Sequence, residues 1–531
     1  MNRGGALDFR ASTGLRWILA IVAGITLWRV FAALVLPLTR DEAYYYDWAG
    51  SLAWGYFDHP PAVALIGIGH WLEPGSVLSA RLGAVAIGSL VLIVLWRLYR
   101  ASGLRQGEGL LLALILSATT FPSLIAGVVT TPDTALALCW PLALHEALRA
   151  LQGQRKRWLT AGLTTGIGLL GKYTMVVVGP IFLWALIRSD PKALRTPWPY
   201  LGGLIAVLVF LPNILWNANN DWLTMRFQFG HGFSTDTGSI ALAANELPAV
   251  TGAHAYVAGE KEPMAPVERI SSLAGFITQQ LAFWGLILVP AGIALWQRRR
   301  FEAIRTRLTK GLDPAAIPLL GAATIVPLAL FGTVALGSEV EANWAAPYLV
   351  GAAPFVALLI RPVARWVLAA AAANLILASL YVLNTATAFP PLPDAAERAL
   401  RETRGFVELA NYAAGLRRPV IADRYQFAAM LNFYQPGLQV SQWPGITRSS
   451  EYGRGEIAPL PNPEALQQSG FWLLARKFSP PTIEGFQAVE TLSAYSCRDG
   501  RFTVIDGAAA WNAGGCDDPA NVWRLYRYTS D

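Results

Sequence analysis

The chain of 531 residues is 54% hydrophobic and only 15% charged, whereas a soluble globular protein carries about 25% charged residues, so the composition excludes a soluble globular protein and indicates an integral membrane protein. The three cysteines include no CxxC pair and the five histidines are scattered, which argues against iron–sulfur, haem and structural zinc sites of familiar spacing. The formal net charge of +7 is explained by where the basic residues lie along the chain, not by a nucleic-acid partner.

Apolar runs long enough to cross a bilayer, about 18 residues or more, recur along the chain. The runs are 15–38, 77–98, 109–127, 134–151, 199–216, 272–296, 317–336, 345–360 and 367–383. A further apolar segment, 158–187, is too long for one ordinary span and is interrupted by Gly171, Lys172 and Tyr173, so we predict two short helices that meet there. The sequence therefore predicts about 11 transmembrane helices. We expect the first to stay as an anchor, because its apolar core exceeds the roughly 7–15 residues of a signal peptide and no small-residue cleavage site follows.

The basic residues predict how these helices are oriented. Of 42 Lys and Arg residues, 21 lie in connections that alternate along the chain, and the positive-inside rule makes those connections cytoplasmic. They are 3–16, 97–105, 149–157, 188–195, 298–310 and 361–365. A chain of about 11 helices that starts in the cytoplasm ends outside. This predicts a transmembrane domain 1–385 with periplasmic loops 39–76 and 217–271, followed by a periplasmic domain 386–531.

The C-terminal domain has the pattern of a small mixed α/β fold, because its hydropathy drops and helix-like and strand-like stretches alternate. These stretches are 394–416 for the helix and 471–474, 502–505 and 522–528 for the strands. Cys497 and Cys516 both lie in this domain, 19 residues apart. An oxidising compartment permits a disulfide between them, and two free thiols are the alternative.

Polar side chains that solubility does not explain fall, with this topology, on the outer face of the membrane. They are Asp41, Glu42, Asp58, His59, Asp133 and Lys172, together with the polar stretches 213–233 and 337–348. Because carboxylates near hydrocarbon need a polar cavity, we expect one extracytoplasmic cavity to collect them. Asp41 and Glu42 directly follow the first helix, which favours a functional role for both.

The stretch after Asp41 is rich in aromatic residues. Tyr44, Tyr45, Trp48 and Trp54 recur at near-helical spacing, as expected for a helix that lies along the membrane interface. Each ring also fits the aromatic belt that is common at membrane boundaries. Both interpretations stay open at the level of sequence.

Two prolines, Pro60 and Pro61, hold the preceding Asp58 and His59 in an extended backbone. His59 has three interpretations: it binds a phosphate as imidazolium, it shares a divalent cation with Asp58, or it completes a hydrogen bond within the loop. Asp133, which also follows a proline, either caps a helix or lines an active site.

Lys172 is the cation that is hardest to explain, because no acidic residue lies within ten positions of it. A lysine in a membrane needs an anionic partner or a route to water, so it either meets a phosphate or extends to the interface. Arg226 and His231, in an otherwise aromatic loop, are further candidates for the same anion site. Glu341 is either a loop acid or a member of the cavity.

The order of these motifs resembles that of a known enzyme family. DEAYYYDW, WGYFDHPP, TPDTAL, GLLGKYT, PNILWNANNDW with RFQF, and EANWAAPY follow one another within about residues 15–385. This set is similar to the motifs of bacterial GT-C glycosyltransferases of the protein-mannosyltransferase-like group, which includes the aminoarabinose and galacturonic acid transferases of lipid A and core oligosaccharide. The resemblance implies a GT-C fold, which is a polytopic α-helical membrane domain, joined here to a C-terminal periplasmic mixed α/β domain.

The resemblance also implies a function. The chain is expected to transfer a sugar, with inversion, from a polyprenyl-phosphate donor to lipid A, core oligosaccharide or another envelope glycan, in the bacterial inner membrane with its active site facing the periplasm. Asp41 is then the general base with Glu42 beside it. The candidates for stabilising the leaving phosphate are Lys172, Arg226 and His59. The residues expected in the sugar and acceptor pocket are Tyr44, Tyr45, Tyr56, Asp58, Asp133, Asn217, His231 and Glu341.

One position departs from the family pattern. Aminoarabinose transferases carry a lysine where this chain has His59, whose charge titrates near neutrality, so aminoarabinose is not carried over as the sugar. The chemistry requires no cofactor, and Asp58, His59 and His231 are the candidates if a divalent cation binds. A protein hydroxyl is an alternative acceptor. The rival classes are a secondary transporter or lipid flippase and a non-catalytic glycan-binding protein; the transporter fits less well because the acids gather at one membrane face.

Overall fold

The computed structural model describes residues 11–104, 107–233, 246–256, 264–296, 301–338, 340–507 and 518–531. The chain divides into two compact units, which we call the helical unit and the sheet unit. The helical unit comprises Met1–Ala32, Ala84–Asn219 and Glu262–Ser379, and the sheet unit comprises Ala33–Gly83, Asn220–Lys261 and Leu380–Asp531. The predicted loop 39–76 therefore groups with the C-terminal region, and the predicted domain boundary at residue 385 stays a prediction.

Several helices are long and apolar enough to cross a membrane, which makes the chain a multi-pass membrane protein. Among the described residues, five segments pass this test by length and composition. They are Leu15–Val35 in α1 (Ala11–Val35), α4 (Val77–Ala101), α10 (Trp198–Asn219), α15 (Ala316–Ala335) and Ala353–Thr387, which contains α16 (Ala353–Ile360) and α17 (Ala364–Thr387). Other predicted spans correspond to shorter or more polar helices, such as α5 (Glu108–Ala118) and α7 (Pro132–Leu151), so the count of about 11 stays a prediction.

The run 158–187 forms two short helices that meet at Lys172, as predicted. α8 (Trp158–Gly171) ends at Lys172, whose backbone is extended. The chain continues through η3 (Tyr173–Val177) into α9 (Val178–Ser189). The lysine thus lies at a helix end, where the helical hydrogen-bond pattern stops.

The run 272–296 is not the single span that the sequence predicts. It is divided between α12 (Pro266–Ala282) and the helical segment Gly285–Trp296, which are bent by 92° relative to each other. Gly285 has φ 56°, a conformation that glycine adopts without strain. The side-chain oxygen of Asn374 accepts from the backbone N–H of Leu286 (2.9 Å), and its amide donates to the carbonyl of Trp284 (3.0 Å). The turn is therefore fixed by hydrogen bonds from α17.

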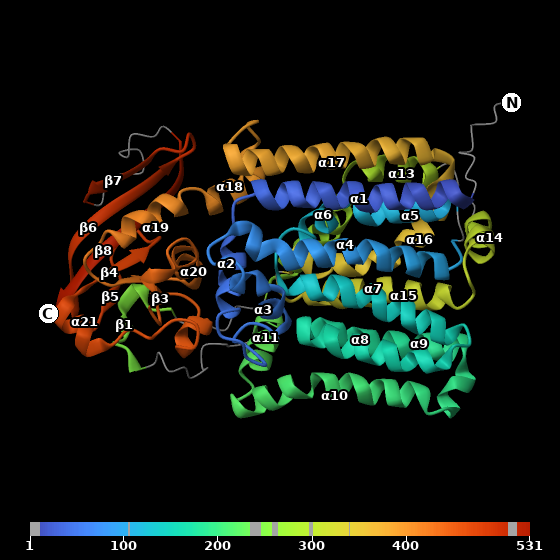
Figure 1. The fold of residues 1–531 in the computed structure, drawn as a ribbon, viewed down its shortest axis with the longest axis horizontal. Coiled ribbons are helices and arrows are strands. Elements are labelled where there is room, and N and C mark those ends of the chain that lie inside the picture. The colour runs from blue at the N-terminus through green and yellow to red at the C-terminus, as the bar shows by residue number, and fades with distance from the viewer. Residues whose placement is uncertain are drawn as a thin grey trace. The chain divides into compact units, whose positions relative to one another are not determined.

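Helices of the helical unit run in similar directions (Figure 1) and approach one another closely at small residues. α8 packs against both α7 and α10. A Cβ atom at Gly162 of α8 would lie only 1.9 Å from the carbonyl oxygen of Gly202 of α10, so this crossing requires glycine, as in many membrane helix pairs.

The sheet unit contains one mixed sheet, with eight strands in the described residues. In spatial order these are β1 (Val250–Thr251), β5 (Thr482–Ile483), β6 (Phe486–Cys497), β8 (Pro519–Ser530), β4 (Phe471–Ala475), β2 (Val420–Ala422) and β3 (Ser441–Gln442), with β7 (Phe502–Asp506) paired to β6. β2 pairs in parallel with β3 and β4, and the other pairs are antiparallel. The mixed α/β prediction is confirmed, and the three predicted strands correspond to β4, β7 and β8.

The predicted helix 394–416 is interrupted. Its parts are α18 (Arg398–Thr403) and α19 (Phe406–Ala414), separated at Gly405, which has φ 86°. A Cβ atom there would lie 2.3 Å from that of Ser496. Further helices of the sheet unit are α20 (Tyr425–Tyr434) and α21 (Pro463–Ser469).

The helix α2 (Arg40–Trp48), which carries Asp41, belongs to the core of the sheet unit. Tyr44, Tyr46 and Trp48 are at most 4% exposed, and α2 packs against α20. The prediction that this helix lies along the membrane interface through its rings is therefore wrong for Tyr44 and Trp48, because α20 and its neighbours cover them. Trp54 remains 53% exposed.

Candidate active site

Glu42 fixes the start of α2. The hydroxyl of Thr39 accepts from the backbone N–H of Glu42 (3.3 Å), and the Glu42 carboxylate accepts from that of Thr39 (3.1 Å), which is a capping box. Arg81 donates to both Glu42 oxygens (2.9 and 2.7 Å), and both side chains are fully buried. With both oxygens bound in this way, Glu42 supports the helix that presents Asp41.

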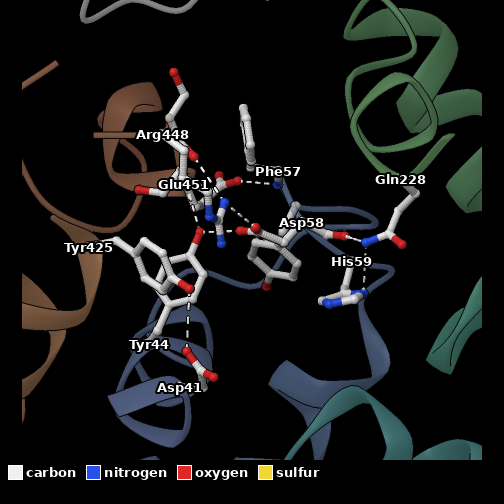
Figure 2. Close-up of polar contacts among 12 residues, drawn as sticks. Asp41, Tyr44, Phe57, Asp58, His59, Gln228, Tyr425, Arg448 and Glu451 are labelled. Carbon is white, nitrogen blue, oxygen red and sulfur yellow. Dashed lines mark hydrogen bonds and ion pairs between the residues drawn. The ribbon is translucent and has the colours of Figure 1, made fainter. Parts of the chain in front are cut away.

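Asp41 lies in the first turn of α2 and is exposed. The hydroxyl of Tyr425 donates to its Oδ1 (3.4 Å), as Figure 2 shows. Although solvent reaches the side chain, the surrounding protein excludes much of the water and so raises the pKa of Asp41. The cation of Arg448 opposes this rise, and the negative charge of Asp58 adds to it. Asp41 is thus a carboxyl group with an elevated proton affinity that remains accessible.

Asp58 is held between a tyrosine and an arginine. It is 2% exposed and accepts from the Tyr44 hydroxyl (2.5 Å) and from Nη1 of Arg448 (2.7 Å). The Arg448 guanidinium lies 4.4 Å from the ring centroid of Tyr425 and 5.2 Å from that of Phe227, which are cation–π distances. Arg448 comes from the C-terminal sequence, and sequence reasoning missed it.

The segment that follows Arg448 makes further contacts with the first loop (Figure 2). The Glu451 carboxylate accepts from the backbone N–H of Phe57 (2.6 Å) and from Nε of Arg454 (2.9 Å). Burial raises the pKa of Glu451 to about 8, and Arg454 opposes the rise. The Tyr452 hydroxyl donates to Asp47 of α2. These contacts tie the loop containing Asp58 to the C-terminal part of the same unit.

His59 faces α11 (Leu223–Phe233), which carries the RFQF motif. The Gln228 side-chain nitrogen lies 3.3 Å from Nδ1 of His59 and also donates to the carbonyl of Asp58. His59 therefore lies within hydrogen-bond distance of a side chain from another segment, and its three predicted interpretations stay open. Arg226 is exposed on the same helix, and the side chain of His231 lies outside the described residues.

The three tyrosines predicted for the pocket have different surroundings. The Tyr44 hydroxyl contacts Asp58 and accepts from the backbone N–H of Glu451 (2.8 Å). Tyr45 is half-buried, with its ring 5.9 Å from that of His59. Tyr56 is buried, stacks on Trp48 at 4.2 Å and donates to backbone carbonyls, so it supports the loop.

A second polar cluster lies in the helical unit. Lys172 donates to Asp133 (2.7 Å), and both side chains are largely buried. Asn343 also donates to Asp133 (3.4 Å). Thr131 is the N-cap of α7 and Asp133 lies in its first turn, so the interpretation of Asp133 as the cap is wrong. Asp133 is instead the anionic partner that a buried Lys172 requires.

Amides of α10 extend this cluster. The Tyr173 hydroxyl donates to Asn213 (2.9 Å), and the buried Asn217 donates to that hydroxyl (3.1 Å). Glu341 is exposed and precedes the short helix η8 (Ala342–Trp344). Asn217 therefore lies beside the residue that follows Lys172, whereas Glu341 lies at the surface.

The predicted site residues fall into both units. Asp41, Asp58 and His59 belong to the sheet unit, and Asp133 and Lys172 belong to the helical unit. Within each unit the structure places these five residues near one another, and the single cavity shared by all the predicted residues stays a prediction.

Metal and disulfide candidates stand as follows. Among the described residues, no group of three or more His, Cys, Asp and Glu side chains is arranged to hold a metal ion, and the Asp58 oxygens already contact Tyr44 and Arg448. Cys497 is buried at the end of β6. Cys516 lies outside the described residues, so the disulfide between the two stays a prediction.

Comparison with known proteins identifies similar sequences. Residues 58–216 match the family model described as dolichyl-phosphate-mannose-protein mannosyltransferase. The chain is 27% identical over 223 residues to the lipopolysaccharide core galacturonosyltransferase RgtA of Rhizobium johnstonii, covering 40% of this chain and 44% of that protein. It is 27% identical over 215 residues to the lipid A galacturonosyltransferase RgtD of the same organism, covering 39% and 45%. The chain thus spans less than half the length of these relatives.

Solved structures extend the likeness to nearly the whole chain. ArnT from Cupriavidus metallidurans in the apo state is 15% identical with a TM-score of 0.60, covering 97% of this chain and 98% of that chain. The structure of ArnT bound to undecaprenyl phosphate has a TM-score of 0.59 at 15% identity, covering 94% and 99%. At this identity the likeness concerns the fold. The resemblance predicted from the motifs is therefore confirmed: the chain has the GT-C fold, and its residues 58–216 match the protein-mannosyltransferase family model.

Proposed function

We propose that this chain is a membrane glycosyltransferase that transfers a sugar from a polyprenyl-phosphate donor to lipid A, core oligosaccharide or another envelope glycan. The active site and the sheet unit would face the periplasm, with the chain in the bacterial inner membrane. The observation that carries this proposal is the accessible Asp41 carboxyl, held at the start of α2 and surrounded by Tyr425, Asp58 and Arg448. The names of the relatives and the fold support the same reaction class.

In this proposal Asp41 acts as the general base. Its carboxylate takes the proton of the acceptor hydroxyl while the oxygen attacks the anomeric carbon, and the bond from that carbon to the donor phosphate oxygen breaks with inversion. The elevated pKa of Asp41 makes it a stronger base than an ordinary aspartate, and a positioned base contributes roughly 10² to 10⁴ in rate.

The leaving polyprenyl phosphate gains negative charge, and cations would stabilise it. Lys172, Arg226 and His59 are the proposed ligands. Asp133 holds the Lys172 ammonium at 2.7 Å, and a donor phosphate would share the same cation. The reaction needs no metal, and a divalent cation at Asp58, His59 and His231 is the remaining alternative.

The proposed set of sugar-binding residues has members in each unit. In the sheet unit it comprises Asp58, Tyr44 and Tyr45, and Arg448 adds a cation that would attract an acidic sugar. In the helical unit it comprises Asp133 and Asn217, and Glu341 and His231 are the weaker candidates. The largely buried rings of Tyr425 and Phe227 lie beside the Arg448 guanidinium at cation–π distances.

A transfer assay tests the proposal. The purified protein would be incubated with polyprenyl-phosphate donors that carry labelled neutral, amino or uronic sugars, and with lipid A and core acceptors. We expect one donor class to label the glycolipid and to release polyprenyl phosphate. Folded protein that transfers none of these sugars to any acceptor contradicts the proposal. If the label is found on secreted protein instead, the acceptor is a protein hydroxyl and not a glycolipid.

A further inference from the structure

The helical unit contains a basic cavity in a part that the proposed reaction does not use. The cavity has a volume of about 510 Å³, which is within the range of ligand pockets. Its walls come from α5, α14 (Phe301–Gly311) and the junction of α16 with η10 (Arg361–Val363). α16 packs against both α5 and α14. A Cβ atom at Gly311 would lie 2.6 Å from Cδ1 of Leu358, so the two helices meet closely at the cavity wall.

The cavity carries an excess of positive charge. Arg307 and Lys310 are three residues apart on α14, which places them on one helix face, and both are exposed. Arg361 lies 3.3 Å from Glu108, and half of its side chain remains exposed. Three cations thus share the cavity with one carboxylate, which favours an anion over a neutral or cationic ligand.

Two candidate membrane-spanning segments begin next to the cavity. The candidate membrane span α15 begins at Ala316, five residues after Gly311, and α17 begins at Ala364, three residues after Arg361. Figure 1 shows α14 at the end of the helical unit where α4 ends and α17 begins. Apolar Leu358 and Pro362 line the cavity beside the cations. A ligand there would meet both charge and apolar surface.

We propose that this cavity binds the phosphate headgroup of an anionic phospholipid. A phosphodiester supplies one negative charge for the Arg307, Lys310 and Arg361 cations, and the start of its acyl chains fits against Leu358 and Pro362. Basic pockets between membrane helices are known sites for anionic lipid headgroups on the cytoplasmic side. The basic residues of this end predict the same side. The bound lipid would hold α5, α14 and α16 together.

Lipid binding to matched double variants tests this site. R307Q/K310Q removes two cations from the cavity. K192Q/R195Q removes an equal charge from η4 (Pro191–Arg195), where Lys192 and Arg195 are exposed and do not line the cavity. Wild type and both variants would be titrated with phosphatidylglycerol in neutral lipid nanodiscs. Each cation near the membrane surface contributes about 1 kcal/mol to the binding of anionic lipid. Loss of both in R307Q/K310Q should therefore weaken phosphatidylglycerol binding roughly 30-fold. We expect K192Q/R195Q to bind like wild type.

Two outcomes would overturn the proposal. One is equal phosphatidylglycerol binding by both double variants. The other is an increase in unfolding temperature with inorganic phosphate that is as large as the increase with the lipid. That result would mean that the cavity binds a free anion. If R307Q/K310Q does not fold, K310Q alone and its control K192Q provide the same comparison.

Discussion

Arg448 sets the charge around the candidate base. Its guanidinium pairs with Asp58 at 2.7 Å, and it opposes the rise in the pKa of Asp41 that loss of water causes. Because Arg448 is followed by Glu451 in the same network, the C-terminal sequence contributes directly to the surroundings of a residue near the N-terminus.

We predict that R448Q shifts the pH dependence of transfer. Removing the cation raises the pKa of Asp41 further. The rate rises with pH as Asp41 loses its proton, and this rising limb should therefore move to higher pH in the variant. The measurement is kcat/KM against pH for wild type and variant. R501Q, which removes an exposed arginine paired with Asp499, serves as control. A limb that stays in place or moves to lower pH argues against Asp41 as the base beside Arg448.

Glu42 and Arg81 form a buried ion pair, and we predict that E42Q destabilises the protein strongly. Removing one partner leaves the Arg81 cation buried without its counter-ion, which costs about 3–5 kcal/mol. The measurement is thermal unfolding in detergent. E42Q/R81M, which removes both charges, should recover part of the loss. An unchanged unfolding temperature in E42Q would contradict the structural role given to this pair.

At the scale of elements, Gly285 decides the path of the chain between α12 and α13 (Leu288–Trp296). We predict that G285A lowers the stability by about 1–3 kcal/mol, because alanine is strained at positive φ and its Cβ would lie 2.4 Å from the Asn374 oxygen. G292A is the matched control, since a Cβ there meets nothing within 4 Å. Equal unfolding temperatures for the two variants would show that the turn does not need glycine.

The breaks in the apolar runs show what local sequence can and cannot predict. Lys172 is a charged residue inside an apolar run, and the break there was predictable from its polarity. Gly285 lies among apolar residues, and Asn374, which bonds the backbone of its neighbour Leu286, is 88 residues from that neighbour, so hydropathy did not predict this break. The strand β6 was missed for a related reason, because its sequence FQAVETLSAYSC mixes polar and small residues and its pairing is with distant strands.

The same limit applies to the candidate site. The loop with Asp58 and His59 was predictable because two prolines and the acid are neighbours in sequence. Arg448 and Glu451 were not, since their contacts with Asp58 and Phe57 join residues about 390 positions apart. The burial of Tyr44 and Trp48 was missed likewise, because the covering helix α20 lies far along the chain.

At the scale of the whole molecule, the candidate residues are shared between two units. The sheet unit holds the proposed base with Asp58 and Arg448, and the helical unit holds Lys172 with Asp133. The proposed reaction requires both clusters to act on one donor, since proton removal and phosphate departure occur at the same sugar carbon. The proposed reaction would therefore depend on residues from nearly the full length of the chain.

The most direct test of the central claim is the single-turnover transfer rate of D41N with a labelled polyprenyl-phosphate sugar. D394N is the matched control, because Asp394 is a highly exposed aspartate of the same unit. The account predicts that D41N transfers sugar about 10² to 10⁴ times more slowly than wild type while D394N is unchanged. Wild-type transfer by folded D41N would contradict it.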